Sequence, residues 1–394
     1  MTDVVLVLNA GSSSIKFAVY PSGTNTVPLI RGKVAGVGRD PVFSAVRADG
    51  TAIDMVMPKN IDAAADHEAL ISLLLDWLAE HRADRRLVAV GHRVVHGGRD
   101  FLKPVIVDDS VLSQLEQLIP LAPLHQPHNL AAIRAISRLQ PTVPQVACFD
   151  TSFHQTQDRL AQLFALPRDL SDEGIIRYGF HGLSYEYIAG ILPDHLGERA
   201  EGRVIVAHLG NGASMCAMKN RQSVATSMGF TALDGLMMGR RCGALDAGVV
   251  LYLMQSKGLN ATEIETLLYR RCGLLGVSGI SNNMRELERS DDPKAREAIE
   301  LFCFRAASVL GGLVTALGGL DAIVFTAGIG ENSALVRKLI CDRLACFGVD
   351  LDPNSNEGNS PRIGSVQSSI DVLVLPTDEE IVISNATNET VALG

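Results

Sequence analysis

Two strand-like runs flank a small polar turn at the start of the chain. Apolar residues fill positions 4–8, the turn covers residues 9–14, and a second β-prone run covers residues 15–20. This alternation of runs and turn predicts a β-hairpin. The turn is suited to an anion, because Gly11 permits a close approach of the backbone and because Asn9, three serines and the following Lys16 supply donors.

The same pattern returns two hundred residues later. Residues 204–218 read VIVAHLGNGASMCAM, which again places two apolar runs around a turn rich in glycine and polar residues. Two copies of one strand–turn–strand unit are a form of internal repeat. They predict an α/β protein with two similar domains that face each other across a phosphate-binding cleft.

Further elements follow from periodicity and from turn residues. Leu70, Leu73, Leu74 and Trp77 recur at helical spacing and predict a core helix over residues 64–80. The other predicted helices are 109–118, 129–139, 301–317 and one from Tyr185 onward; the other predicted strands are 87–91, 145–149, 322–326 and 372–375.

Three segments are predicted to be loops or turns. Prolines 120, 123 and 127 indicate an extended, non-helical path, residues 327–333 form a turn, and residues 351–369 form a surface loop. The spacing of Thr377 and Glu380 predicts a capping box at the last helix, which leaves Glu379 as the freer carboxylate. The domain boundary is placed after Asp150, so that residues 1–150, joined by residues 377–394, form one domain and residues 151–376 form the other.

Charged residues stand beside glycines where predicted strands or loops end. Arg93 lies in the run 91–98, His181 lies between two glycines before a helix, and Arg240 and Arg241 share a glycine-dense loop. Arginines in such places favour phosphate. Asp150 ends a strand, where a carboxylate serves either as a helix cap or as a Mg²⁺ or base position.

Composition narrows the classes of function. The chain has 394 residues, a net charge of −9 and no basic block, which excludes nucleic acid and an anionic membrane as expected partners. Seven cysteines form no CxxC pair, which is typical of reduced thiols in a cytoplasmic protein. Cys242 follows two arginines that favour a lowered pKa, but we interpret it as a packed residue. The sequence lacks a P-loop, a G-x-G-x-x-G turn and the protein-kinase motifs.

Taken together, these stretches resemble the acetate kinase family, within the actin, hexokinase and Hsp70 superfamily. The matching stretches, in chain order, are 9–16, 91–98, 122–125, 149–155, 177–185, 208–214, 239–243, 326–333 and 376–380. The resemblance spans nearly the whole chain. It implies two RNase-H-like domains around a central nucleotide cleft, a homodimer, and Mg²⁺ or Mn²⁺ with ATP or ADP. The domain of residues 1–150 and 377–394 would be the acyl and phosphoryl side, and that of residues 151–376 would bind the nucleotide. The implied reaction is the reversible phosphorylation of acetate to acetyl phosphate.

The resemblance also implies a role for each matching residue. Arg93 and Arg241 would hold acetate and the moving phosphoryl group, which His181 would contact, while Asp150 and Glu379, with Asn9, would belong to the metal. The implied phosphate and nucleotide positions are Asn9, Ser12, Ser14, Lys16, His208, Asn211, Gly212, Asn283, Arg285, Gly330, Glu331 and Asn332. The implied acyl pocket comprises Arg93, Val95, Leu124, His125, Phe180 and Ala232.

Four positions depart from the family pattern, and alternatives remain open. Asn283 stands where an aspartate is usual, Ala232 where a proline is usual, and Ala244 and Ala247 replace an aspartate and a proline. A propionate or short-chain fatty-acid kinase of the same family is one alternative. A sugar or glycerol kinase of the superfamily, with Asp150 as base, is another, and an ATP-driven chaperone or filament protein is a third.

Overall fold

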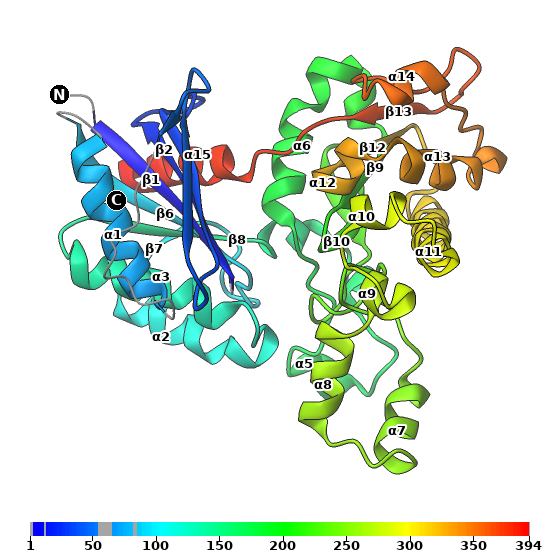
Figure 1. Cartoon of the computed structure of the whole chain (residues 1–394), viewed down its shortest axis with the longest axis horizontal. Coiled ribbons are helices and arrows are strands. Elements are labelled where there is room, and N and C mark those ends of the chain that lie inside the picture. Colours follow the sequence, from blue (N-terminus) through cyan, green and yellow to red (C-terminus); the bar gives the residue numbers. More distant parts are fainter. Residues whose placement is uncertain (1–2, 12, 54–64, 82–84, 394) are drawn as a thin grey trace. The chain divides into compact units, whose positions relative to one another are not determined.

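The structure is a computed structural model of the chain, and it describes residues 3–11, 13–53, 65–81 and 85–393. Ser12 and the predicted helix start at Ala64 lie outside the described residues. The chain divides into two compact units (Figure 1). The first unit comprises Met1–Ser152 and Asp378–Gly394, and the second comprises Phe153–Thr377.

The first unit is built on an eight-stranded sheet of order β5-β4-β3-β2-β1-β6-β8-β7. Its strands are β1 (Asp3–Ala10), β2 (Ser14–Pro21), β3 (Ile30–Ala35), β4 (Val42–Arg47), β5 (Ala52–Ile53), β6 (Arg86–Val94), β7 (Val105–Ile106) and β8 (Gln145–Phe149). β1 pairs with β2 in antiparallel register, with Asn9 opposite Lys16, so the predicted hairpin is confirmed. β1, β6 and β8 run parallel, and their carboxyl ends therefore meet at one edge of the sheet.

Helices cover both faces of this sheet. α1 (His67–His81) and α3 (Gln126–Leu139) bury apolar side chains on one face, where Phe17, Phe43 and Trp77 form an aromatic cluster. α15 (Glu379–Leu393) packs on β1, β6 and β8. A Cβ atom on Gly91 of β6 would lie 2.6 Å from the Ile383 side chain, so α15 approaches the sheet as closely as glycine allows. α2 (Asp109–Gln117) completes the unit beside α3.

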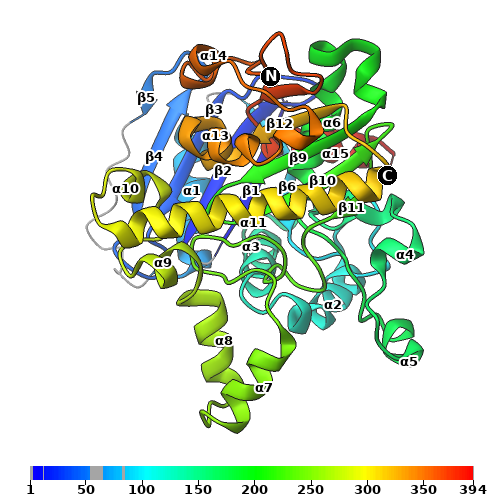
Figure 2. The ribbon, with the colours of Figure 1, turned by 90° about the vertical axis from the view of Figure 1, so that its right-hand side faces the viewer.

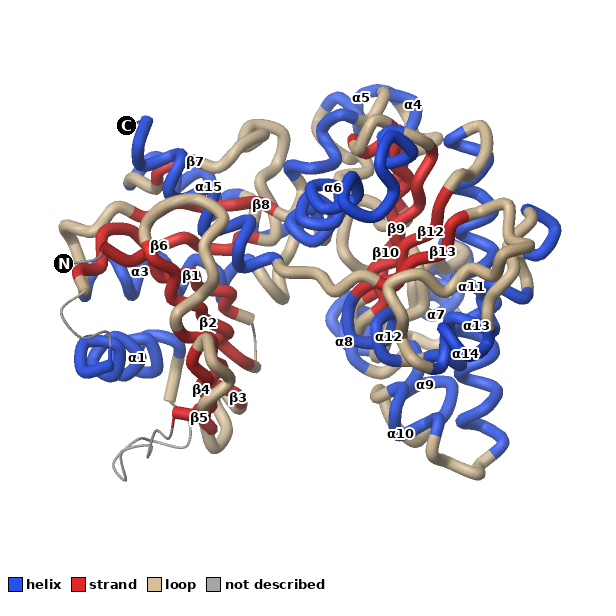
Figure 3. The backbone as a smooth tube through the Cα atoms, turned by 90° about the horizontal axis from the view of Figure 1, so that it is seen from above, coloured by secondary structure: helices blue, strands red, loops and turns tan. Residues whose placement is uncertain are grey.

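The second unit contains a five-stranded sheet of order β11-β10-β9-β12-β13. Its strands β9, β10, β12 and β13 are labelled in Figure 3. The strands are β9 (Arg203–Leu209), β10 (Ala213–Lys219), β11 (Gln222–Thr226), β12 (Ala322–Thr326) and β13 (Asp371–Val374). β9 and β10 form the second hairpin, with His208 opposite Ser214. β9 pairs in parallel with the later strand β12, just as β1 pairs in parallel with β6. The repeat in the sequence therefore corresponds to the same strand arrangement in both units.

Two long helices pack on this second sheet. α6 (Gly182–Leu196) buries Tyr185, Ile188 and Leu192 against β9, β10 and β12. α11 (Pro293–Leu317) lies across β9, β10 and β11 (Figure 2). Among the described helices, α11 alone is long and apolar enough to cross a membrane, but half of its most apolar window is buried in the unit, as expected for a core helix.

The remaining helices of the second unit are short. They are α4 (Arg159–Gln162), α5 (Arg168–Asp172), α7 (Ala247–Gln255), α8 (Ala261–Arg270), α9 (Gly273–Ser278), α10 (Met284–Glu288), α12 (Ala327–Asn332), α13 (Ala334–Asp342) and α14 (Pro353–Glu357). Short 3₁₀ turns cover Ile119–Leu121, Ser152–Thr156, Gly197–Glu201 and Ala345–Phe347.

Two loop predictions were wrong, and a third was incomplete. Pro120 lies in the turn Ile119–Leu121 and Pro127 lies in the first turn of α3, where a missing N–H costs nothing. Residues 327–332 form the helix α12. Ala327 begins this helix with a φ of +65°, a conformation that no sequence pattern predicts for an alanine. The predicted loop 351–369 contains α14, capped by Asp352.

Candidate phosphoryl-transfer site

Three parallel strands of the first unit bring a cluster of polar side chains to one edge. Asn9 lies near the end of β1, Arg93 near the end of β6, and Asp150 directly after β8. Arg93 Nε donates to Asp150 Oδ1 over 3.0 Å, and Nη2 donates to Oδ2 over 2.5 Å. Arg93 Nη1 donates to Asn9 Oδ1 over 3.2 Å. The predicted strand ended at Gly91, whereas β6 continues to Val94, and this extension fixes the Arg93 backbone in the sheet.

A second carboxylate reaches the same guanidinium from α15. Glu379 Oε2 lies 3.8 Å from Arg93 Nε. Burial alone would lower the pKa of Arg93, but the charges of Asp150 and Glu379 outweigh it and raise that pKa. The Asp150 side chain is only 1% exposed, so the pair is held in a largely water-excluded environment.

The donor chemistry of this cluster fits a hard divalent cation. Two carboxylates and the Asn9 amide oxygen surround one guanidinium, and oxygen ligands are what Mg²⁺ prefers. Within the described ranges, no three His, Cys, Asp or Glu side chains are grouped so that they could hold a metal ion. A cation held here would therefore take most of its ligands from water and substrate, which is usual for Mg²⁺.

The predicted capping box at α15 was wrong. The side chain that caps this helix is Asp378, whose Oδ1 accepts from Ile381 N over 3.1 Å. Thr377 instead interacts through its hydroxyl with Ser184 Oγ over 2.8 Å, and its N–H donates to Glu331. The capping residue lies one position later than predicted, because Thr377 belongs to the second unit and is held there by Ser184 and Glu331.

Glu380 is thereby released from the capping role that the sequence assigned. It lines a hollow of about 300 Å³ on the β2–β4 face, together with Lys16, Arg31 and Lys33. Burial, together with the neighbouring Glu379, raises the pKa of Glu380, and the charge of Lys16 opposes this rise. Arg31 at the same hollow forms an ion pair with Asp378. Ser14 begins β2, and its carbonyl accepts from Gly11 N over 2.9 Å, which closes the first turn.

In the second unit, His181 stands at the N-terminus of α6 in a strained conformation. Its φ of +59° is left-handed, which is costly for a residue with a Cβ. His181 Nδ1 lies 2.8 Å from Ser214 Oγ, and the ring stacks on His208 with centroids 4.2 Å apart. His208 Nδ1 lies 2.8 Å from Ser184 Oγ. These contacts hold one face and one edge of the His181 ring in place.

The loop that carries Arg241 packs on the second hairpin turn. Arg241 Nη1 donates to the Ala232 carbonyl over 2.5 Å. A Cβ atom on Gly212 would lie 2.7 Å from Arg241 Nη2 and 3.4 Å from His181 Nε2. Gly212 is therefore what lets the turn approach both side chains, and Gly239 N donates to the Asn211 carbonyl beside them.

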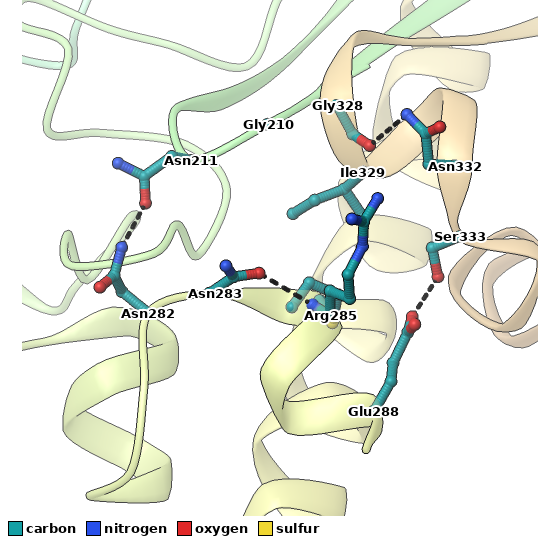
Figure 4. A pocket seen from close by; sticks show the side chains of 11 residues that line it. Gly210, Asn211, Asn282, Asn283, Arg285, Glu288, Gly328, Ile329, Asn332 and Ser333 are labelled. Carbon is teal, nitrogen blue, oxygen red and sulfur yellow. Dashed lines mark hydrogen bonds between the residues drawn. The ribbon is translucent and has the colours of Figure 1, made fainter. Parts of the chain in front are cut away.

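A polar pocket of about 360 Å³ opens in the same unit (Figure 4). Its lining combines the Gly210–Asn211 turn, the start of α10 and the helix α12. The residues that line it are Gly210, Asn211, Asn282, Asn283, Met284, Arg285, Glu288, Gly328, Ile329, Asn332 and Ser333. Asn282 Nδ2 donates to Asn211 Oδ1 over 3.0 Å, and Asn283 Oδ1 caps α10 by accepting from Arg285 N.

The structure brings only part of the predicted nucleotide set to this pocket. Asn211, Asn283, Arg285 and Asn332 line it, whereas the predicted members His208, Gly212, Gly330 and Glu331 of the same unit do not. Glu331 Oε1 instead accepts from Ala327 N over 2.8 Å, and the Gly330 carbonyl accepts from the buried Arg337. Sequence reasoning missed Asn282, Glu288 and Ser333, although the adjacent Asn282–Asn283 pair before a helix was a usable signal.

The predicted acyl-pocket residues fall in both units. Val95, Leu124 and His125 lie in the first unit, and Phe180 and Ala232 lie in the second. Val95 is 4% exposed, and its N–H donates to Asn129 Oδ1 over 3.0 Å. Asn129 Nδ2 in turn donates to the Ala10 carbonyl at the end of β1. Asn129, which sequence reasoning missed, therefore ties the Arg93 segment to the first hairpin.

The fold and these clusters define a class of protein. These features are typical of a phosphotransferase: two hairpins with glycine turns, arginines at their edges, and a polar pocket beside the start of a helix. The profile of the Acetokinase family matches residues 4–385. An acetate kinase of Rhodopseudomonas palustris is 54% identical over 391 residues, which cover 98% of this chain and 97% of that protein.

Solved structures agree with the sequence relatives. A propionate kinase of Francisella tularensis superposes with a TM-score of 0.91 at 36% identity, covering 98% of this chain and 99% of that one. An acetate kinase of Porphyromonas gingivalis gives a TM-score of 0.87 at 35% identity, covering 99% and 100%. The chain belongs to the acetokinase family, and it is a phosphotransferase with a carboxyl group as acceptor. The predicted family and fold class are confirmed.

Proposed function

We propose that the protein is an acetate kinase that transfers the terminal phosphoryl group of Mg-ATP directly to acetate and runs in both directions. The observation that carries the proposal is the Arg93–Asp150–Glu379 cluster at the ends of parallel strands, in a chain of the acetokinase family. A carboxylic acid with a pKa of about 4 to 5 is already ionised at pH 7, so the nucleophile needs no general base. It needs positive charge, because two anions must meet.

The first unit would hold the acceptor and the metal. Arg93 binds the acetate carboxylate, and its bonds to Asp150 and Asn9 fix the plane of the guanidinium. Asp150, Glu379 and Asn9 would hold Mg²⁺, or Mn²⁺ in its place. When bound, the cation neutralises charge on the phosphate oxygens. Val95 and Leu124 contribute apolar walls for the acetate methyl group, and His125 follows Leu124 in the chain.

The second unit would hold the nucleotide and the phosphoryl group in transit. The polar pocket takes the nucleoside of ATP or ADP, with Asn211 and Gly210 at its phosphate side and Asn283 and Arg285 at its far side. His181 and Arg241 lie beside Gly212, where donors would stabilise the charge of a loose, metaphosphate-like transition state. His208 orients His181 by stacking. In the first unit, Lys16 and the serines of the first turn would bind phosphate.

Sequence relatives named acetate kinase favour acetate over propionate as the acceptor. The relative at 54% identity is named acetate kinase, whereas the propionate kinase is 36% identical. Ala232 stands where the family has a proline, and the smaller side chain would tolerate one more methylene. We therefore expect propionate to be a second, poorer substrate. A sugar or glycerol acceptor is disfavoured, because a neutral hydroxyl gives Arg93 and Arg241 no charge to bind.

The protein would act in the cytoplasm as a homodimer. Its seven cysteines form no disulfide among the described residues, which fits a reducing compartment. The helix α7 buries none of its residues in the described chain, and it exposes Leu251, Tyr252 and Met254 by 47–54%. A contiguous apolar helix face of this kind is suited to the same helix of a second copy.

The deciding experiment measures ADP release from Mg-ATP with a panel of acetate, propionate, butyrate, glycerol and glucose, and hydroxamate formation with the three carboxylates. Acetate should give the highest kcat/KM, propionate a lower one, and both alcohols none. Arg241→Ala should lower kcat by roughly 10²-fold or more, and added guanidine should restore part of it. Turnover of glycerol or glucose in place of acetate would refute the proposed reaction. An Arg241→Ala variant with a changed KM and an unchanged kcat would refute the transition-state role of Arg241.

A further inference from the structure

The loop that carries Arg241 is joined to a second segment by backbone hydrogen bonds. Cys272 N donates to the Arg240 carbonyl over 3.0 Å, and Leu274 N donates to the Met238 carbonyl over 2.9 Å. On the other side of the loop, Cys242 N donates to the Leu268 carbonyl over 3.3 Å. The backbone around Arg241 is thus held by the segment that connects α8 and α9.

This close approach depends on a glycine. Gly273 has a φ of +65°, and a Cβ atom there would lie 2.1 Å from the Met238 carbonyl oxygen and 2.9 Å from the Arg241 carbonyl oxygen. No side chain fits in that space, so glycine is required on both conformational and steric grounds. The residue that precedes this glycine is Cys272, and the residue that follows Arg241 is Cys242.

The two thiols face each other across this junction. Their side chains are within hydrogen-bonding contact, and both residues are only partly buried. Contact with Cys242 lowers the pKa of Cys272 to about 7, burial opposes the shift, and Arg271 adds to it. The same contact raises the pKa of Cys242. The sequence favoured a lowered pKa at Cys242, whereas the contact in the structure lowers the pKa of Cys272 and raises that of Cys242.

The other cysteines offer no comparable pair. Cys148, Cys216, Cys303 and Cys341 are buried, and Cys346 is exposed near the end of α13. Buried thiols are inert toward polar oxidants, and a single exposed thiol has no resolving partner. The Cys242–Cys272 pair therefore combines partial exposure, a lowered pKa at Cys272 and a second sulfur within reach.

We propose that Cys242 and Cys272 are an oxidation site, at which a hydroperoxide converts the two thiols to a disulfide and thereby inactivates the enzyme reversibly. The Cys272 thiolate attacks the peroxide oxygen, which forms Cys272 sulfenic acid and releases water from hydrogen peroxide once the leaving hydroxide takes a proton. The Cys242 sulfur then attacks the sulfenic sulfur, which forms the S–S bond and releases a second water. Two electrons pass from the thiols to the peroxide, and a dithiol reductant reverses the change.

The disulfide would act on the reaction through its neighbour in the chain. Two sulfurs in hydrogen-bonding contact must move closer to form a bond of about 2 Å. Because there is no free space around Gly273 at this junction, the approach of the two sulfurs would displace the backbone of residues 238–242, which includes Arg241. A displacement of about 1 Å at a positioning group can cost roughly 10²-fold in rate. The inactivation rests on the proposed function of Arg241, whereas the disulfide itself does not.

The test treats the whole reduced protein with hydrogen peroxide and follows two readouts. Peptide mapping by mass spectrometry should find a Cys242–Cys272 cross-link two hydrogens lighter than the reduced pair, and dithiothreitol should remove it. Acetate kinase activity should fall in parallel, by up to about 10²-fold, and recover with dithiothreitol. Cys272→Ser and, separately, Cys242→Ser should keep their activity under the same treatment. Cys346→Ser is the matched control, and it should remain as sensitive as the wild type.

Several results would overturn the proposal, and they differ from failure of the proposed function. A cross-link between other cysteines, or a Cys272→Ser variant that is inactivated as fast as the wild type, would remove the site. A complete Cys242–Cys272 cross-link with unchanged activity would refute its regulatory effect. An enzyme that never phosphorylates acetate would refute the proposed function, while the mapped cross-link would still test the site. If Cys272→Ser failed to fold, Cys242→Ser and the cross-link map would decide.

Discussion

Removing Arg93 should unfold the first unit more readily, in addition to abolishing catalysis. The Arg93 side chain is 19% exposed and its partner Asp150 is 1% exposed. Arg93→Ala would leave the Asp150 carboxylate buried without its counter-ion, with Glu379 beside it. Breaking a buried pair by removing one partner costs about 3–5 kcal/mol, most of it from the charge left behind. We expect a loss of unfolding free energy in that range.

The matched control is a second arginine–carboxylate pair of the same unit. Arg31 pairs with Asp378, but these side chains are 40% and 19% exposed. Solvent screens the exposed partner, so Arg31→Ala should cost under about 1 kcal/mol. If burial decides the cost, Asp150→Asn placed in the Arg93→Ala background should recover part of the loss, because an amide carries no charge that needs a partner.

The chain offers a convenient probe for this measurement. Its single tryptophan, Trp77, lies in α1 and packs edge-on against Phe43, with ring centroids 4.7 Å apart. Tryptophan fluorescence during urea unfolding therefore reports the first unit. A loss below 1 kcal/mol for Arg93→Ala, or an Arg31→Ala variant that is destabilised equally, would refute the argument from burial. So would an Asp150→Asn second substitution that makes Arg93→Ala worse.

Three further outcomes are expected. Asp378→Ala should lower the free energy of unfolding by about 1–2 kcal/mol, because it removes the cap of α15. Glu380→Gln should change the free energy of unfolding in urea by less than about 0.5 kcal/mol. A larger loss for Glu380→Gln than for Asp378→Ala would instead support the capping box of Thr377 and Glu380. Burial lowers the pKa of His92 to about 4, so the stability that its neutral form contributes is present above pH 6.5 and is lost as the pH falls toward 4. That loss should reach about 1.4 kcal/mol at pH 5.5, and a His92→Gln variant whose unfolding free energy kept the full pH dependence would contradict it. Ala232→Pro should raise the acetate-to-propionate ratio of kcat/KM by up to about tenfold, and an unchanged ratio would exclude position 232 from the acyl pocket.

Elements that rest on regular patterning could be predicted from the sequence. The strands Gln145–Phe149 and Ala322–Thr326 and both hairpins were expected from apolar runs bounded by turn residues, and the structure contains them. Each is almost fully buried, so a continuous apolar run was sufficient evidence. The candidate site was predictable to the same extent: Arg93 and Asp150 stand at strand ends, and parallel strands bring those ends together.

Elements that depend on tertiary partners could not be predicted. Ala327 starts α12 in a left-handed conformation, which is maintained where Glu331 accepts from its N–H. Glu331 therefore has a structural contact that no motif reveals. Asp378 and not Thr377 caps α15, because Thr377 is engaged by Ser184 and Glu331 far along the chain. Local capping rules rank candidates correctly only while no distant group competes for them.

The two hairpins show how one element supports different electrostatics. The turn after β1 meets Arg93, which the neighbouring parallel strand supplies and which two carboxylates hold. The turn after β9 instead meets Arg241, which a separate loop supplies and which a backbone carbonyl holds. A strand-borne arginine is fixed by the sheet, whereas a loop-borne one depends on the packing of its loop. The glycine-mediated junction with Cys272 supplies that packing, so Arg241, and not Arg93, is the arginine whose position a covalent change nearby can alter.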